Sequence, residues 1–234
     1  MLRSRPVTTS GGQREGRAQP HYNLIAAQSL PRIAALSDGI FAVAMTLLVL
    51  GLSVPAVNEV RSEGELGTAL GNLLPSLVTY LMSFLTLGIF WAGQQTQLNH
   101  LERSDRNLTW IYLGFLLTVS LMPFSTGLLA HFIGYRLALL VYWLNIFVLG
   151  ALLYASLAYS QHAGLVIDVQ SRGRVLMTRD RLVKALRRRI VVAQALYAIA
   201  AALAIVNTYV SIALIVAVQL NYAIAPPIPL LRRL

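Results

Sequence analysis

The sequence predicts an all-α integral membrane protein with six transmembrane helices and both termini in the cytoplasm. Of its 234 residues, 56% are hydrophobic and only 12% are charged, which is about half the charged fraction of an average soluble domain. Several long stretches contain no Asp, Glu, Lys or Arg, and a helix needs roughly 20 apolar residues to cross the hydrocarbon core of a bilayer. A soluble core built by a chain of this length could not bury so many apolar segments.

The expected spans follow one another along the chain. The first covers residues 32–54, where a single carboxylate interrupts an apolar run. Three uncharged stretches hold one span each: residues 66–101, 107–135 and 137–167. The last uncharged stretch, residues 190–231, is too long for one span. Its most polar interruption, Asn207-Thr208, divides it into two short spans at about residues 184–206 and 208–224.

The segment before the first span has a different composition. Residues 1–29 contain several arginines and one acidic residue, but no apolar run of the kind that a secretory signal requires. An Arg-rich leader poor in acids is also compatible with an organellar transit peptide. We predict a disordered basic cytoplasmic tail at residues 1–29, followed by a six-helix transmembrane domain at residues 30–234.

Basic residues are distributed asymmetrically between the loops. All but two of the 19 lysines and arginines lie at or before residue 32, at residues 103–106, at residues 172–189 or at the C-terminal end. The exceptions are Arg61 and Arg136. Because basic loops remain on the cytoplasmic side, the pattern places both termini there, as an even number of spans requires.

The basic loop at residues 172–189 predicts a contact with lipid. We expect it to continue as an amphipathic helix at the headgroups, where its arginines attract anionic lipids. Nucleic-acid binding is the alternative for a chain with a net charge of +10. It is disfavoured because the basic residues are divided among loops that separate apolar spans. The expected partners are therefore the bilayer and its anionic lipids, and not nucleic acid.

Motifs for catalysis are missing from the sequence. The chain has no cysteine, and its four histidines do not form an HxxxH or HExxH spacing. A Gly-rich phosphate loop and a Gly-x-Ser-x-Gly elbow are also absent. We therefore expect no enzyme, no catalytic residues, no metal site and no cofactor.

The first span carries the only carboxylate placed within a hydrophobic segment, Asp38. An ionisable residue in such a position is expensive and usually functional. At about 100° per residue, the helix separates into two faces. One face is mostly aliphatic and contains Leu36, Gly39, Val43, Thr46, Leu47 and Leu50; the opposite face contains Ser37, Asp38, Phe41 and Met45. Because Arg32 is six positions before Asp38, the two do not stack on the helix, and Asp38 needs a partner from another helix or chain.

This segment resembles a known signature. The run Arg32-x-x-x-Leu36-Ser37-Asp38-Gly39-Ile40-Phe41-Ala42-Val43-Ala44-x-Thr46-Leu47-Leu48-Val49-Leu50 is similar to the first helix of the prokaryotic relatives of the lysosomal potassium channel TMEM175. Weaker matches follow at Trp91, His100 and Met122-Pro123-Phe124. Two departures concern the packing of the motif: Leu36 replaces an aromatic residue, and Gln94-Gln95 stands where many relatives have His.

The resemblance implies a homotetrameric, potassium-preferring cation channel in the bacterial cell membrane, with one pore lined by the first helix of each subunit. Carried over by position, the narrow rings of the pore are Val43, Leu47 and Leu50, and the Thr46 hydroxyl lies beside them as a selectivity candidate. The permeant ion is K⁺. The aliphatic face deduced from helical geometry contains all four residues. For Thr46, a hydrogen bond to a carbonyl within its own helix is the alternative.

The opposite face is expected to fix the first helix to its neighbours. The predicted helix-locking network comprises Arg32, Ser37, Asp38, Trp91 and His100. Asp38 serves there as a hydrogen-bond acceptor, with the Trp91 indole and the His100 imidazole as candidate donors. An interfacial anchor remains open for Trp91, and an ordinary loop or interfacial histidine for His100.

Two other functions are compatible with the same composition. A secondary transporter would show broken helices and a polar site near the middle of the membrane, for which Asp38 is the one available residue. A non-conducting membrane scaffold is the third interpretation.

Overall fold

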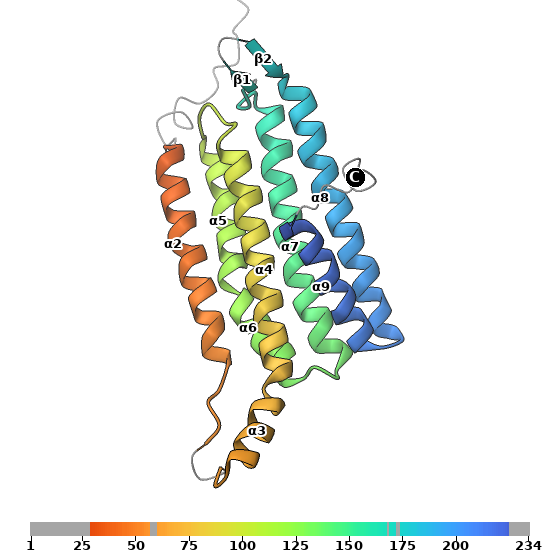
Figure 1. Ribbon diagram of the computed structural model, residues 1–234. Helices are drawn as coiled ribbons and strands as arrows, with labels where there is room; N and C mark the ends of the chain where they lie inside the picture. Colours follow the sequence, from red (N-terminus) through yellow and green to blue (C-terminus); the bar gives the residue numbers. More distant parts are fainter. Residues whose placement is uncertain (1–28, 57–59, 168, 172–173, 225–234) are drawn as a thin grey trace, which may run out of the picture.

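The computed structural model describes residues 29–56, 60–167, 169–171 and 174–224. The predicted tail at residues 1–29 lies almost wholly outside this part of the chain, as does the basic C-terminal end. The described residues form an elongated bundle of roughly parallel and antiparallel helices (Figure 1). A helix lies at every segment at which the sequence predicts a span.

The helices of the first half are as follows: α2 (Leu30–Leu48), the 3₁₀-helix η1 (Val49–Gly51), α3 (Glu63–Asn72), α4 (Leu74–Leu98), α5 (Arg106–Ser120) and α6 (Met122–His131). The second half contains α7 (Arg136–His162), the strands β1 (Val169–Ser171) and β2 (Arg174–Met177), α8 (Arg179–Ala202), the 3₁₀-helix η3 (Leu203–Ile205) and α9 (Thr208–Ile224). The strands pair antiparallel as a small hairpin at the end of the bundle where α8 begins (Figure 1).

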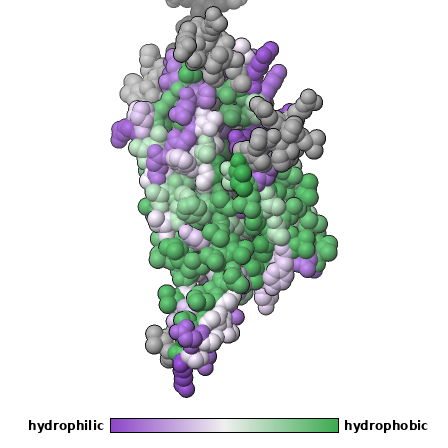
Figure 2. Space-filling model, in the orientation of Figure 1, coloured by the Kyte–Doolittle hydropathy of each residue, from purple (hydrophilic) through white to green (hydrophobic). Residues whose placement is uncertain are grey.

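Five helical segments in the described part of the chain are long and apolar enough to cross a membrane, and α9 is a shorter apolar helix. The five run as follows: Leu30–Gly51, Leu74–Leu98, Arg106–His131, Arg136–His162 and Arg179–Ile205. On the face that Figure 2 shows, a broad hydrophobic band crosses the middle of the bundle, and hydrophilic residues are concentrated toward its two ends. The protein is an integral, multi-pass membrane protein, and the prediction of a helical membrane fold is confirmed.

Two of the uncharged stretches contain more than one helix. The stretch at residues 66–101 holds one continuous span, α4, as predicted, and α4 is preceded by α3, a separate helix that projects beyond the bundle (Figure 1). Ser62 caps α3 by accepting a hydrogen bond of 3.2 Å from the backbone N–H of Glu65, as polar residues before a helix commonly do. The segment expected at 107–135 divides into α5 and α6 at Leu121. Pro123 accounts for this break, because proline removes a backbone donor and is accepted only in the first turn of a helix.

The fifth span and the basic amphipathic helix form one continuous helix, α8. The sequence predicts a span that begins at about Lys184, whereas α8 begins earlier and runs unbroken from Arg179 to Ala202. Its first half carries the basic residues and its second half is apolar. The turn predicted at Asn207-Thr208 separates α8 and η3 from α9, and Asn207 accepts hydrogen bonds from the backbone N–H groups of Tyr209 and Val210.

The core combines apolar packing with a buried polar cluster. Phe115 of α5 packs against Phe41 of α2 and Phe90 of α4, with ring centroids 6.0 and 6.3 Å apart. Between α4, α6, α7 and α9, side-chain hydroxyls and one amide form a connected set of hydrogen bonds: Ser83, Thr86, Thr126, Tyr142 and Gln219. Because backbone groups of a membrane helix are already paired within the helix, such side-chain bonds fix how neighbouring helices are oriented.

Candidate functional site

The helix α2 has two distinct faces in the folded subunit. Its buried residues recur at helical spacing: Ile33, Ser37, Phe41, Ala44 and Leu48. This face packs against α4, α5 and α6. Most of the remaining circumference of α2 is exposed, and α2 lies at one edge of the bundle (Figure 1).

The uncovered face carries the aliphatic residues that the sequence singled out. Val43 is 58% exposed, Leu47 45% and Leu50 74%, and Leu36 lies on the same side of the helix. Apolar side chains that recur along an entire membrane helix without a partner in their own subunit are suited to face lipid, another subunit or a pore. The structure thus places the three predicted ring residues on one exposed stripe.

Thr46 lies on this stripe and is also exposed. Its hydroxyl donates a hydrogen bond of 2.8 Å to the carbonyl oxygen of Val43, within the same helix. This is the local bond that sequence reasoning gave as the alternative to a role in the pore. A hydroxyl that donates its only proton keeps two lone pairs on its oxygen, so the bond leaves an acceptor directed away from the helix axis.

Asp38 is held by two donors from α4. The indole Nε1 of Trp91 donates to its Oδ1 at 2.8 Å, and the amide Nε2 of Gln95 donates to the same oxygen at 2.7 Å. Trp91 and Gln95 are one turn apart and therefore lie on the same face of α4. The carboxylate at the start of the membrane-embedded helix is thus tied to the adjacent helix rather than to the aliphatic stripe.

Ser37 forms a parallel tie in the interior. It is fully buried, and its hydroxyl accepts a hydrogen bond of 2.8 Å from Nε2 of Gln94. The other amide atom of Gln94, Oε1, is buried and has no hydrogen-bond partner among the described residues. Ser37 and Asp38 together connect two consecutive positions of α2 to two consecutive positions of α4.

Two residues of the predicted network lie elsewhere. The Nδ1 of His100, which lies in the turn just after α4, is 2.6 Å from the carbonyl oxygen of Thr96 in α4. Because a carbonyl oxygen only accepts, this nitrogen carries the proton and donates to the end of α4. Arg32 is exposed at the start of α2 and lines a small cavity of about 80 Å³ together with Tyr112 and Leu116. Within the described residues neither side chain contacts Asp38, so the structure does not bring them into the Asp38 cluster.

Sequence reasoning missed the two glutamines, Gln94 and Gln95. They were noted only as a departure from a histidine in relatives. The helical spacing held the signal, because a donor at position 95 shares a face with Trp91 and its neighbour at position 94 points toward the interior. No cluster of three or more His, Asp or Glu suited to a metal ion occurs among the described residues.

Comparison with known proteins bears on the same part of the chain. The family described as "Endosomal/lysosomal potassium channel TMEM175" matches residues 32–123, a region that contains α2, α4, α5 and every residue of the site. Residues 32–123 are therefore similar to the TMEM175 family. This confirms the resemblance drawn from the first-helix motif.

Several proteins named as ion channels are similar to part of the chain. A protein of Streptomyces collinus named a potassium channel is 38% identical over 102 residues, which are 44% of this chain and 48% of that one. A potassium channel of Chamaesiphon minutus is 35% identical over 102 residues, which are 44% of this chain and 50% of its own length. The human endosomal/lysosomal proton channel TMEM175 is 33% identical over 119 residues, 47% of this chain and 23% of that protein. The match thus spans about half the length of the bacterial relatives.

The fold extends the similarity beyond the matched sequence. The crystal structure of a lysosomal potassium-selective channel TMEM175 homolog from Chamaesiphon minutus superposes with a TM-score of 0.69 at 24% identity, over 84% of this chain and 97% of that chain. The helices that follow residue 123 lie outside the match to the family model, and they share the arrangement found in that protein.

Proposed function

We propose that the chain is the pore-forming subunit of a homotetrameric, potassium-preferring cation channel in the bacterial cell membrane. The observation that carries this proposal is the exposed aliphatic stripe of α2, which lies opposite a face fixed to α4. Four copies of α2 around one axis would cover the stripe and place Val43, Leu47 and Leu50 at the centre. The TMEM175 relatives named as potassium channels support this assignment.

The orientation of α2 supports the same arrangement. A pore helix must keep one face toward the pore axis. Apolar contacts alone hold a helix only weakly against rotation about its own axis. The bonds from Trp91, Gln95 and Gln94 to Asp38 and Ser37 hold α2 at one rotation relative to α4. In this proposal these residues lock the helix, and the acidic side chain lies outside the ion path.

The rings would form a hydrophobic constriction. Val43, Leu47 and Leu50 offer an ion no oxygen atoms, so a narrow passage between them would lose its water and impose the full dehydration penalty on a cation. Such a pore closes without a plug. Opening requires the rings to separate until a hydrated or partly hydrated ion passes.

Thr46 is the selectivity candidate of this pore. Its oxygen, free to accept while its proton is bonded to the Val43 carbonyl, would offer four ligands around the axis to a partly dehydrated cation. This partial compensation for lost water is the chemistry through which K⁺ would be preferred.

The topology proposed for each subunit has six helices, with α9 as the sixth, and both termini in the cytoplasm. The end of the bundle that carries the hairpin and the basic half of α8 would then face the cytoplasm, where α8 contacts anionic headgroups. The end that carries α3, with Glu63 and Glu65, would lie outside.

Single-channel recording tests the proposal. The full chain, purified and reconstituted in planar bilayers, is expected to give unitary currents whose reversal potential follows the K⁺ gradient more closely than the Na⁺ gradient. Because the human relative is named a proton channel, a pH gradient is applied as a third condition. Ion flux without unitary currents would favour a secondary transporter. Folded oligomers that carry no ion flux would favour a non-conducting membrane scaffold.

A further inference from the structure

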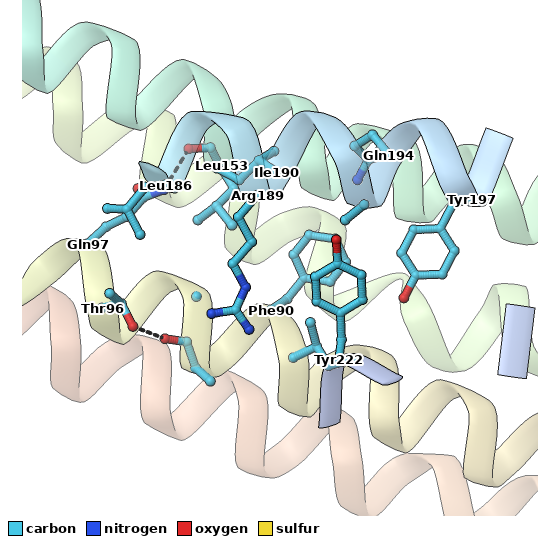
Figure 3. Close-up of a pocket in the computed structure, with 14 residues that line it drawn as sticks. Phe90, Thr96, Gln97, Leu153, Leu186, Arg189, Ile190, Gln194, Tyr197 and Tyr222 are labelled. Atoms are coloured by element: carbon cyan, nitrogen blue, oxygen red, sulfur yellow. Dashed lines mark hydrogen bonds between the residues drawn. The ribbon is translucent and has the colours of Figure 1, made fainter. Parts of the chain in front are cut away.

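A pocket separate from the exposed face of α2 lies between α4, α7, α8 and α9 (Figure 3). Its volume is about 110 Å³, several times the ~10–15 Å³ that one water requires on a comparable measure. No residue of α2 is among those that line it. Leu153 of α7 forms part of its wall, and the other lining residues come from α4, α8 and α9.

The lining is graded along the length of the bundle. On α4, Thr96 and Gln97 lie near the helix end that faces the basic end of the bundle, whereas Ile89 and Phe90 lie about 12 Å deeper. The helix α8 runs in the opposite direction (Figure 1). Its pocket residues therefore begin with Leu186 and reach Tyr197 about 17 Å deeper, with Arg189 about one turn after Leu186. Thr96, Gln97 and Arg189 thus gather toward one end of the pocket. The wall beyond them is formed mostly by apolar side chains and by Tyr197 and Tyr222, with the amide of Gln194 as a further polar group.

Arg189 supplies the charge at the polar end. Its guanidinium lies 5.7 Å from the ring centroid of Tyr222 on α9, and Figure 3 shows the side chain extending from α8 between Thr96 and Tyr222. No carboxylate is among the described residues that line the pocket. The acid on α8, Asp180, is nine positions earlier, about 13 Å along the helix.

The neighbouring arginines are placed differently. Arg187 donates a hydrogen bond of 3.0 Å to Oε1 of Gln161 and lies over the ring of Tyr154. Arg188 and Arg189 are both exposed, but Arg188 does not line the pocket. Of the three consecutive arginines, Arg189 alone lines the pocket, where its charge lies beside apolar side chains. The pocket is therefore a specific site and not merely part of the basic surface of α8.

We infer that this pocket binds one anionic lipid of the surrounding leaflet. Its phosphate or carboxylate headgroup lies on Arg189, and part of an acyl chain lies along the wall toward Phe90 and Tyr197. A lipid matches both ends of the pocket, whereas a soluble anion would leave the apolar wall uncovered. The inference needs only that the chain is embedded in a bilayer and is independent of channel activity.

Native mass spectrometry of the delipidated full chain tests the site. Phosphatidylglycerol is expected to saturate at one tightly bound molecule per chain. Phosphatidylcholine with the same acyl chains tests the headgroup charge, and glycerol 3-phosphate tests the headgroup without a tail. Both should bind far more weakly. Binding of glycerol 3-phosphate as tight as that of the lipid would identify a soluble-anion site and overturn the inference.

Substitutions locate the lipid. Arg189→Gln should weaken phosphatidylglycerol binding roughly tenfold, the loss expected for one charge-assisted contact. Arg188→Gln removes the same charge outside the pocket and should leave binding nearly unchanged. Equal losses in the two variants would mean diffuse attraction to α8 and would overturn the site.

A third variant tests the apolar wall. Ala193→Phe fills the space beside Arg189 and should weaken binding of the long-chain lipid without removing a charge. A measurement on the unaltered protein guards against misfolding of the variants: a diazirine-bearing phosphatidylglycerol should crosslink to α4 and α8 at the pocket. Crosslinks confined to other helices would exclude it.

Discussion

The indole nitrogen of Trp91 donates a hydrogen bond of 2.8 Å to Oδ1 of Asp38, and this bond joins the exposed helix α2 to α4. Gln95 donates to the same oxygen at 2.7 Å. A single carboxylate oxygen thus receives both donors, so the strength of each bond depends on the presence of the other. Because the two donors share one acceptor, single and double substitutions can measure how much each residue contributes to the stability of the subunit.

Removing one donor should reveal this coupling. Trp91→Phe keeps the ring and loses the N–H, and we expect it to destabilise the subunit by roughly 1 kcal/mol, a modest value because Asp38 is partly screened by solvent. Combined with Asp38→Ala, the loss should be less than additive. Melting temperatures of the single and double variants in detergent measure the effect. Trp110→Phe, at an exposed indole on α5, is the matched control; additive losses would argue against a direct bond.

Asp38→Asn should affect assembly more than ion selectivity. The amide keeps one oxygen but loses the charge, so both bonds from α4 weaken, and α2 is held less firmly at the proposed tetramer axis. Tetramer recovery by size-exclusion chromatography and the Na⁺-to-K⁺ permeability ratio of the surviving channels are the two measurements. A fully assembled variant with an altered ratio would place Asp38 in the ion path.

Polar substitution of the rings should increase basal conductance. Leu47→Asn or Leu50→Asn gives the constriction side chains that retain water, which lowers the dehydration barrier. Currents in reconstituted bilayers should rise severalfold at rest. Leu117→Asn, at an exposed leucine of α5, makes the same change away from the proposed pore and should have no such effect. Unchanged or abolished current in folded tetramers would count against a gate at these rings.

Thr46→Val should shift the K⁺-to-Na⁺ permeability ratio toward one. Valine keeps nearly the same shape but removes the oxygen, so the pore stays open to ions while losing its candidate ligand. Thr46→Ser retains the hydroxyl and is the control, expected to resemble the parent. Reversal potentials under bi-ionic conditions give the ratio. A valine variant indistinguishable from the parent would assign the Thr46 hydroxyl to its bond with Val43 alone.

Gly150→Ala should destabilise the contact between α7 and α8. An added Cβ would lie 1.7 Å from the side-chain nitrogen of Gln194, so the glutamine would have to move and would lose its bond to the carbonyl oxygen of Ile146. We expect a loss of about 1–3 kcal/mol. Shortening the partner with Gln194→Ala should restore most of it, as read from melting temperatures. No rescue by the second substitution would mean that the strain lies in the backbone.

The sequence predicted the positions of the spanning helices well, for a clear physical reason. In a bilayer a long run without charged residues can satisfy its backbone hydrogen bonds only as a helix, so the uncharged stretches indicated where α4 and α7 lie. The polar pair Asn207-Thr208 indicated the turn before α9. The breaks were harder to predict. The separation of α5 from α6 depends on Pro123, and α3 depends on the cap at Ser62, both of which are local features within runs that composition alone would treat as continuous.

The site was predicted in part for a related reason. The exposed stripe of α2 follows from helical geometry within one segment, so Val43, Leu47 and Leu50 could be grouped without a structure. The partners of Asp38 come from another helix. Their identity depends on the rotation and depth of α4. In the structure Trp91 and Gln95 bind Asp38, whereas His100, just after α4, bonds to the carbonyl oxygen of Thr96.

The bonds between α2 and α4 lie at Ser37 and Asp38, whereas beyond Phe41 the described part of α2 is held by apolar contacts. Apolar contacts permit sliding, so these two residues define a pivot. Leu50 lies about 18 Å beyond it and Val43 about 8 Å. A tilt of about 5° at the pivot would therefore displace Leu50 by about 1.6 Å and Val43 by less than half as much. As a hypothesis, the constriction would open from its Leu50 end, and spin labels at position 54 should change their separation between subunits more than labels at position 39.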